Sequence, residues 1–74
     1  IKIYPNPSSG IVNVTLKYAA SGVVKMFNQT GQLVLEKTVS SDNFQIDLSP
    51  FKNGLYVLVV NSGNEVMKEM IVKY

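Results

Sequence analysis

Residues 11–18 have the sequence Ile-Val-Asn-Val-Thr-Leu-Lys-Tyr, in which apolar and polar side chains alternate after the first position. Successive side chains of a β-strand point to opposite faces of the sheet, whereas an amphipathic helix repeats its apolar positions every three or four residues. The alternation therefore predicts a strand with one buried face. That face consists of Val12, Val14, Leu16 and Tyr18.

The same two-residue period extends through most of the remaining chain. Gln32–Val39 and Phe44–Leu48 alternate in this way, and Leu55–Val60 is apolar on both faces, which is typical of a central strand. Turn residues separate these runs, as in Pro5–Gly10, where two prolines remove backbone donors. We expect seven strands, at Ile1–Tyr4, Ile11–Tyr18, Val23–Phe27, Gln32–Val39, Phe44–Leu48, Leu55–Asn61 and Glu65–Lys73.

Seven short strands without a helix predict two packed sheets, because one open sheet would leave an apolar face in water. The chain has 74 residues, 46% of them hydrophobic and 16% charged, so it is apolar enough to fold but long enough for one core only. We expect one domain over residues 1–74, an all-β, immunoglobulin-like antiparallel sandwich. Its expected core is Val12, Val14, Leu16, Val24, Met26, Leu33, Leu35, Phe44, Ile46, Leu48, Tyr56, Leu58, Val60, Met70 and Val72.

Residues 48–56 indicate a tyrosine corner, which is a feature of immunoglobulin-like sandwiches. A turn that contains Pro50 and Asn53 precedes Tyr56, near the start of an apolar strand. We expect the Tyr56 ring to fill core while its hydroxyl bonds a backbone group upstream. Gly54 is expected to supply a backbone conformation that a Cβ disfavours.

The composition leaves few residues for chemistry. Without histidine or cysteine, the commonest general base, the thiol nucleophile and the disulfide are all absent. The carboxylate pairs Asp42 with Asp47 and Glu65 with Glu69 remain, but a domain this small with no evident cleft is not expected to be an enzyme. Asp42, Asn43 and Asp47 lack the ligand density of a calcium loop, so we expect no metal and no other cofactor.

Charge and aromatic content bear on possible partners. The net charge is only +2 and there is no arginine, so nucleic-acid binding is not expected. An adhesive or carbohydrate-associated module of immunoglobulin or fibronectin type, serving as a binding domain or spacer, stays open as an alternative, because sandwich folds host many functions. Sugar binding would require exposed aromatic side chains, and the chain has no tryptophan, four tyrosines and three phenylalanines.

Four stretches carry a resemblance to a known family. Residues 3–14 include Tyr-Pro-Asn-Pro-Ser-Ser-Gly, residues 24–34 pair two strand-like runs around a glycine turn, residues 46–57 include Ile-Asp-Leu-Ser and Gly-Leu-Tyr, and residues 70–73 are Met-Ile-Val-Lys. In this order they resemble the YPNP-x-x-G opening, the strand–turn–strand, the G-x-Y segment and the lysine-bearing end of type A C-terminal sorting domains of the type IX, or Por, secretion system of Bacteroidetes. The chain departs from this pattern at Lys68-Glu69-Met70, where the family often has adjacent lysines, and at Tyr74.

The resemblance implies a non-catalytic signal domain that directs its cargo through the type IX system across the outer membrane. The implied partners are the outer-membrane machinery, a sortase-like peptidase that cuts upstream of the signature, and the N-terminal cargo domain of the same precursor. We expect a monomer that crosses the periplasm and is then secreted or held at the cell surface. The chain begins in a strand-like segment without Met, as expected of part of a longer protein. The recognition residues carried over from the motifs are Tyr4, Pro5, Asn6, Pro7, Gly10, Gly54, Tyr56, Lys68 and Lys73.

The last expected strand provides a mechanism of recognition. Glu65–Lys73 has a charged face, which discourages uncontrolled pairing while its backbone donors remain available at a sheet edge. We hypothesise that a receptor strand pairs with this edge.

Overall fold

The computed structural model describes residues 1–16 and 21–74. Within these residues the regular secondary structure consists of strands, and the predicted bounds are confirmed to within one residue except at the end of the second strand. That strand was expected to continue to Tyr18, but it ends at Thr15 and Leu16 after it is not part of a strand; Lys17 and Tyr18 lie outside the described residues. The strands are β1 (Lys2–Tyr4), β2 (Ile11–Thr15), β3 (Gly22–Phe27), β4 (Leu33–Val39), β5 (Asn43–Asp47), β6 (Gly54–Ser62) and β7 (Glu65–Lys73).

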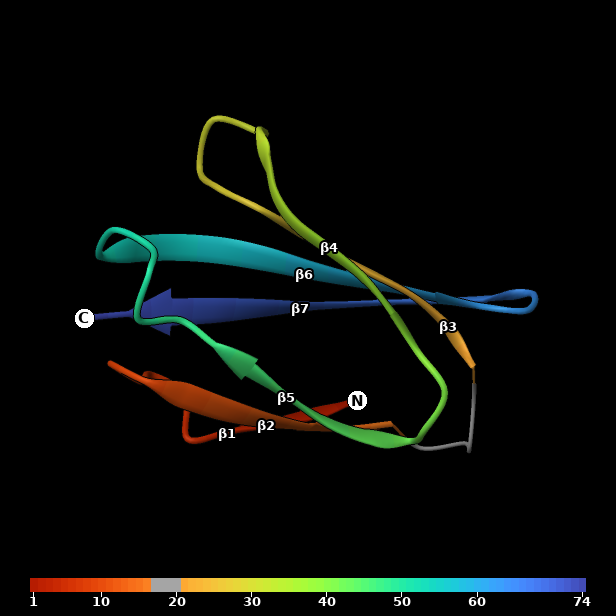
Figure 1. The fold of residues 1–74 in the computed structure, drawn as a ribbon. Helices are drawn as coiled ribbons and strands as arrows, with labels where there is room; N and C mark the ends of the chain where they lie inside the picture. Colours follow the sequence, from red (N-terminus) through yellow and green to blue (C-terminus); the bar gives the residue numbers. More distant parts are fainter. Residues whose placement is uncertain (17–20) are drawn as a thin grey trace.

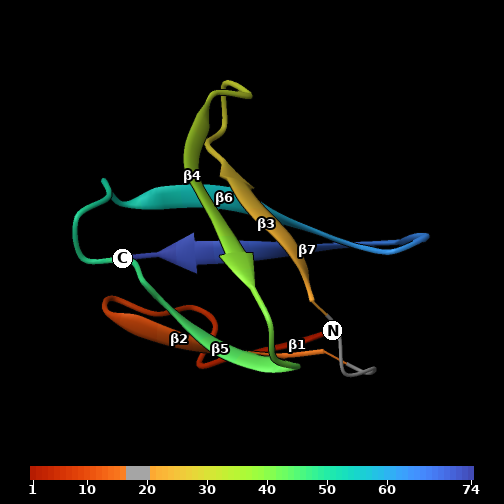
Figure 2. The same cartoon turned by 45° about the vertical axis from the view of Figure 1, so that its right-hand side comes forward.

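The strands form two antiparallel sheets that face each other (Figures 1 and 2). One sheet has the order β1-β2-β5 and the other has the order β4-β3-β6-β7. The chain passes between the sheets from β2 to β3, from β4 to β5 and from β5 to β6, whereas β3–β4 and β6–β7 are neighbours in one sheet. This arrangement confirms the predicted immunoglobulin-like β-sandwich of seven strands.

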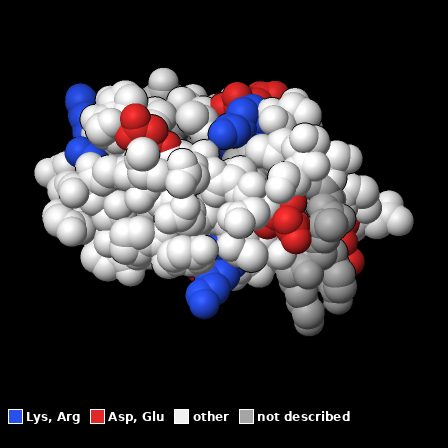
Figure 3. Space-filling view, turned by 60° about the horizontal axis from the view of Figure 1, so that its bottom comes forward, with Lys and Arg blue, Asp and Glu red and all other residues white. Residues whose placement is uncertain are grey.

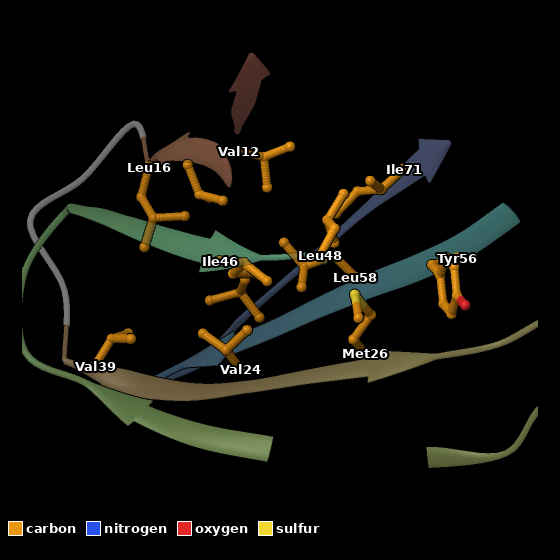
Figure 4. Packing of buried hydrophobic residues seen from close by; sticks show 12 residues of the cluster. Val12, Leu16, Val24, Met26, Val39, Ile46, Leu48, Tyr56, Leu58 and Ile71 are labelled. Atoms are coloured by element: carbon orange, nitrogen blue, oxygen red, sulfur yellow. The ribbon is translucent and has the colours of Figure 1, made fainter. Parts of the chain in front are cut away.

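Apolar side chains from both sheets fill the space between them. Figure 4 shows Leu16, which directly follows β2, and Ile46 of β5 directed toward Val24 and Met26 of β3 in the other sheet. Fully burying one such side chain contributes about 1.5–3 kcal/mol, so a few contacts decide whether so small a domain folds. The buried apolar residues are Val12, Val14, Leu16, Val24, Met26, Val39, Ile46, Leu48, Tyr56, Leu58, Val60 and Ile71.

The predicted core was wrong in β7. Met70 and Val72 are 52% and 40% exposed, whereas Ile71 between them is fully buried. Three consecutive apolar residues carry no alternation, so their pattern cannot identify the inward face. Pairing with β6 decides it, because Ile71 lies opposite the buried Tyr56.

The predicted core was also inaccurate in and beside β4. A register shift next to the last residue of β3 places Leu33 on the outer face, where it is 43% exposed. Such an irregularity moves a side chain to the other face of its sheet, which sequence periodicity does not show. Leu35 and Phe44 are partly buried against the core, and Val39, absent from the predicted set, belongs to it.

Candidate recognition site at the edge of the four-stranded sheet

The loop between β1 and β2 lies against the outer edge of β7, the last strand of the chain (Figures 1 and 2). Asn6 makes two contacts there: its Nδ2 donates to the carbonyl O of Met70 at 2.8 Å, and its Oδ1 accepts from the N–H of Val72 at 3.0 Å. The Asn6 side-chain amide therefore pairs with β7 as the peptide group of a neighbouring strand would. The Tyr4–Pro5 and Asn6–Pro7 peptide bonds are both cis.

Ser8 continues this pairing through its backbone. Its N–H donates to the carbonyl O of Val72 at 2.9 Å, its carbonyl O accepts from the N–H of Tyr74 at 3.2 Å, and it forms a parallel bridge with Lys73. The Ser8 side chain is only 4% exposed, and its Oγ accepts from the N–H of Gly10 at 3.2 Å. Sequence reasoning missed Ser8, because a serine in a turn of Pro, Asn, Ser and Gly is ordinarily a solvent-exposed turn former.

The G-x-Y segment lies beside the same end of β7. Gly54 is the cross-strand neighbour of Lys73, and the Nζ of Lys73 donates to the Oδ1 of Asn53 at 3.1 Å. Gly54 has a φ of +152°, which residues other than glycine rarely adopt. Three segments that resemble separate family motifs therefore meet at one end of the four-stranded sheet. Their meeting point, which we term the motif junction, consists of Asn6, Ser8, Gly54, Val72 and Lys73.

Tyr56 positions the loop that leads into Gly54. Tyr56 is 5% exposed, its hydroxyl donates to the carbonyl O of Lys52 at 2.6 Å, and its ring centroid lies 5.9 Å from that of Phe51. The predicted tyrosine corner is confirmed. Because the Tyr56 hydroxyl is bonded within the domain, this side chain acts on the motif junction through the loop that it holds.

The other predicted recognition residues lie around the junction or away from it. Pro5 and Pro7 are exposed, and Tyr4 is 43% exposed with the Nζ of Lys2 5.6 Å from its ring centroid. Lys68 lies farther along β7, opposite Val59, and is not brought to the junction. The structure thus brings together Asn6, Gly54 and Lys73, and it separates Lys68 from them.

The turn between β3 and β4 borders the loop that precedes the G-x-Y segment. The Oδ1 of Asn28 accepts from the N–H of Thr30 at 3.1 Å and from the N–H of Gln32 at 2.9 Å, which fixes the turn between β3 and β4. Together with Lys52–Tyr56, residues 28–30 line a pocket of about 180 Å³. In the part of the chain that the structure describes, no buried side-chain N or O atom lacks a hydrogen-bond partner, so the pocket presents no unpaired buried polar group to a ligand.

Charged side chains are scattered over the face shown in Figure 3, with no continuous basic area. The Oδ1 of Asp47 accepts from the Oγ of Ser49 at 2.5 Å and from the N–H of Ser49 at 3.0 Å, and these bonds hold the pKa of Asp47 below its usual value of 3.8. Over residues 1–16 and 21–74, no group of three or more His, Cys, Asp or Glu residues could hold a metal ion. None of the described residues form a helix that is long and apolar enough to cross a membrane.

The fold and the motif junction define a small β-sandwich module whose distinctive residues gather at a sheet edge, where another protein can recognise backbone and side chains together. The family is established by comparison. The model of the secretion system C-terminal sorting domain matches residues 2–73, and the chain belongs to this family. It is therefore a non-catalytic sorting signal of the type IX secretion system, which confirms the resemblance found in the sequence.

Two curated proteins illustrate where such a domain occurs. Ulvan lyase NLR42 of Nonlabens ulvanivorans is 27% identical over 74 residues, which cover 97% of this chain and 14% of that protein. The endo-acting ulvan lyase of Formosa agariphila is 26% identical over 76 residues, which cover 99% of this chain and 15% of that protein. The chain thus spans about one seventh of the length of these relatives, and the similarity concerns that part of them only.

Proposed function

We propose that the export machinery recognises the motif junction while the domain is in the periplasm and still joined to its cargo. The observation that supports this proposal is the contact of three motif segments through the Asn6–Val72 and Gly54–Lys73 pairs. After export, a sortase-like peptidase cuts upstream of the signature, and the cargo is released or kept at the cell surface. The proposed recognition residues are Tyr4, Pro5, Asn6, Pro7, Gly10, Gly54, Tyr56, Lys68 and Lys73.

These residues divide into two roles by their exposure. Tyr4, Pro5, Asn6 and Pro7 are exposed and can contact a partner directly, whereas Tyr56 is buried and acts by holding a loop. The junction is formed by residues more than 60 positions apart in the chain. It therefore exists only in the folded domain, so the machinery recognises a shape and not a linear peptide.

The cargo belongs to the same proposal. The two relatives are named as ulvan lyases and are about seven times longer than the matched region. We propose that the cargo of this domain is an extracellular enzyme, with a polysaccharide lyase as the first candidate. Sequencing the gene upstream of Ile1 and assaying its product on soluble polysaccharides would test this assignment, and a preceding domain without enzymatic activity would contradict it.

The export function is tested with a reporter enzyme that carries a periplasmic signal peptide and is fused in front of residues 1–74. In a host with a type IX system, the reporter should reach the medium or the cell surface, and in a strain without the outer-membrane pore it should stay in the periplasm. Retention of the reporter in both strains would contradict the proposal.

A matched pair of lysine variants tests whether the motif junction is recognised. Lys73→Ala removes a junction side chain and should lower export, whereas Lys52→Ala removes an exposed lysine outside the junction and should not. Both fusions must first show the same melting temperature. Equal export by the two variants would show that the machinery does not recognise the lysine of the junction.

A further inference from the structure

The outer edge of β7 is divided into two halves. In an antiparallel ladder both backbone groups of one residue face the same neighbour, and successive residues alternate between neighbours. The bonds of Met70, Val72 and Tyr74 to the loop between β1 and β2 show that even-numbered residues of β7 face away from β6. Val66 and Lys68 therefore also direct their N–H and C=O groups to the outer edge.

The second half of this edge is closed by the chain itself. Asn6 and Ser8 make four hydrogen bonds to Met70, Val72 and Tyr74, at distances of 2.8–3.2 Å. They occupy the positions that backbone groups of an added strand would take. Because Asn6 is exposed and its two contacts are also exposed, water or another peptide can replace them.

The first half of the edge is open. Among the described residues, no hydrogen bond reaches the outward backbone groups of Val66 and Lys68. Val66 is 58% exposed and Met70 is 52% exposed, so apolar side chains flank Lys68 on the outer face of this half. Unpaired edges of this kind accept an additional strand unless something covers them.

We propose that Asn6–Ser8 is a displaceable substitute strand, and that an extended segment of the export machinery pairs first with Val66 and Lys68 and then replaces the loop along Met70–Tyr74. This inference rests on the proposed function, because it names the surface of the same domain with which the machinery pairs. The sequence-based hypothesis of a wholly free terminal edge is thereby modified: the loop leaves only the first half of the edge open until it is released.

The side chains of β7 define the chemistry of the incoming segment. Residues directly opposite each other on neighbouring strands interact, and opposite charges or apolar pairs stabilise the pairing. Positions opposite Val66 and Met70 therefore favour β-branched or aromatic residues, and the position opposite Lys68 favours Asp or Glu. The partner is an extended protein segment in which an acidic residue lies between two apolar residues at alternate positions.

Amide hydrogen exchange on the 74-residue chain tests directly whether Asn6–Ser8 acts as a displaceable clamp on β7. The amides of Val66 and Lys68 should exchange first, those of Val72 and Tyr74 next through release of the loop, and that of Leu58 last, because its strand is central and exchanges with global unfolding. Asn6→Ala removes both Asn6 hydrogen bonds, including the acceptor of the Val72 N–H, and should speed exchange at Val72 by roughly fivefold or more, since about fivefold is expected for the loss of one hydrogen bond.

Asn53→Ala is the control for this measurement, because it removes the partner of the Lys73 Nζ and leaves the β7 backbone bonds in place. It should not change exchange at Val72. The proposal of a displaceable clamp is overturned if Asn6→Ala leaves the exchange rate of the Val72 amide unchanged, or if this amide in the unmodified chain exchanges as slowly as that of Leu58.

Proline variants test the docking edge in the export fusion. Val66→Pro removes an outward N–H of β7, whereas Gln45→Pro alters the edge of β5, where the Gln45 carbonyl O already accepts from the Nζ of Lys37 at 3.1 Å. Val66→Pro should export roughly tenfold less reporter than Gln45→Pro, a ratio that corresponds to about 1.4 kcal/mol. If Val66→Pro does not fold, Lys68→Pro makes the same comparison at the next residue of β7 whose N–H faces outward.

The outcomes separate this inference from the proposed function. Equal export by the two folded proline variants overturns strand addition while leaving the sorting function intact. Failure of the unmodified fusion to be exported contradicts the sorting function, and the exchange measurements then still decide whether Asn6 and Ser8 form a displaceable clamp.

Discussion

Replacing Tyr56 by Phe removes one oxygen atom from the tyrosine corner and leaves the ring in place. In the structure the Tyr56 hydroxyl donates to the Lys52 carbonyl O at 2.6 Å, and the residue is 5% exposed. The ring contacts with Phe51 persist in the variant, so the substitution isolates the hydrogen bond. The hydrogen bond is only part-buried and lies at an exposed residue, so we expect water to solvate the Lys52 carbonyl O after the substitution.

The expected loss of stability is about 1 kcal/mol, the net contribution of a typical intramolecular hydrogen bond. A chain of 74 residues unfolds with an entropy of about 0.16 kcal/mol/K, from an average of about 2.1 cal/mol/K per residue. The melting temperature should therefore fall by about 6 °C. This loss is a substantial part of a total stability of roughly 4–11 kcal/mol.

Thermal unfolding followed by circular dichroism measures the effect, with Tyr74→Phe as the matched control. Tyr74 is 63% exposed, so loss of its hydroxyl should change the melting temperature by about 1 °C or less. If Tyr56→Phe melts within about 1 °C of the unmodified chain, the corner hydrogen bond does not stabilise the fold and the reasoning is refuted.

Three further predictions concern the buried core, the glycine that packs against β6, and the stability of the fold in acid. Leu58→Ala should cost about 2–5 kcal/mol in urea unfolding, because the fully buried side chain leaves a cavity; a loss below about 1 kcal/mol would contradict this. Gly22→Ala should cost about 1–3 kcal/mol in the same assay, because the new Cβ overlaps a carbonyl O of β6, while Gly10→Ala, with no atom within 4 Å, should be nearly neutral. The lowered pKa of Asp47 stabilises the fold above pH 3.8, and this stabilisation is lost as the pH falls through the folded pKa. Any advantage in melting temperature over Asp47→Asn should therefore vanish in acid. A difference between the two proteins that does not depend on pH would argue against the Ser49 bonds as its cause.

Sequence periodicity predicted the strands because most of them have one solvent-exposed face and one buried face. It identified the inward residues wherever polar and apolar side chains alternate, as at Val12 and Val14 of β2. It failed at Met70 and Val72, which belong to a continuous apolar run, and at Leu33, which follows a register shift. In both cases the neighbouring strand, and not the local sequence, decides which side chain is buried.

The candidate site was predictable only as a set of separate motifs. Local turn chemistry and family resemblance indicated Asn6, Gly54 and Lys73, but no local signal pairs Asn6 with Val72, which lies 66 positions away. Ser8 was missed and Asn53 was expected only as a turn residue, because both residue types are common in exposed turns; their importance follows from what they contact. Whether the machinery contacts the junction residues remains a prediction that the lysine and proline variants test.

The pairing of Asn6 and Ser8 with β7 joins a turn near the start of this domain to its seventh strand. A product cut short before Met70, by a premature stop codon or by a protease, has nothing for these two residues to bind. An exporter that pairs along Met70–Tyr74 would therefore bind products that contain the whole of β7 and leave truncated ones behind. The domain would then report that its own chain is complete through β7, in addition to marking its destination.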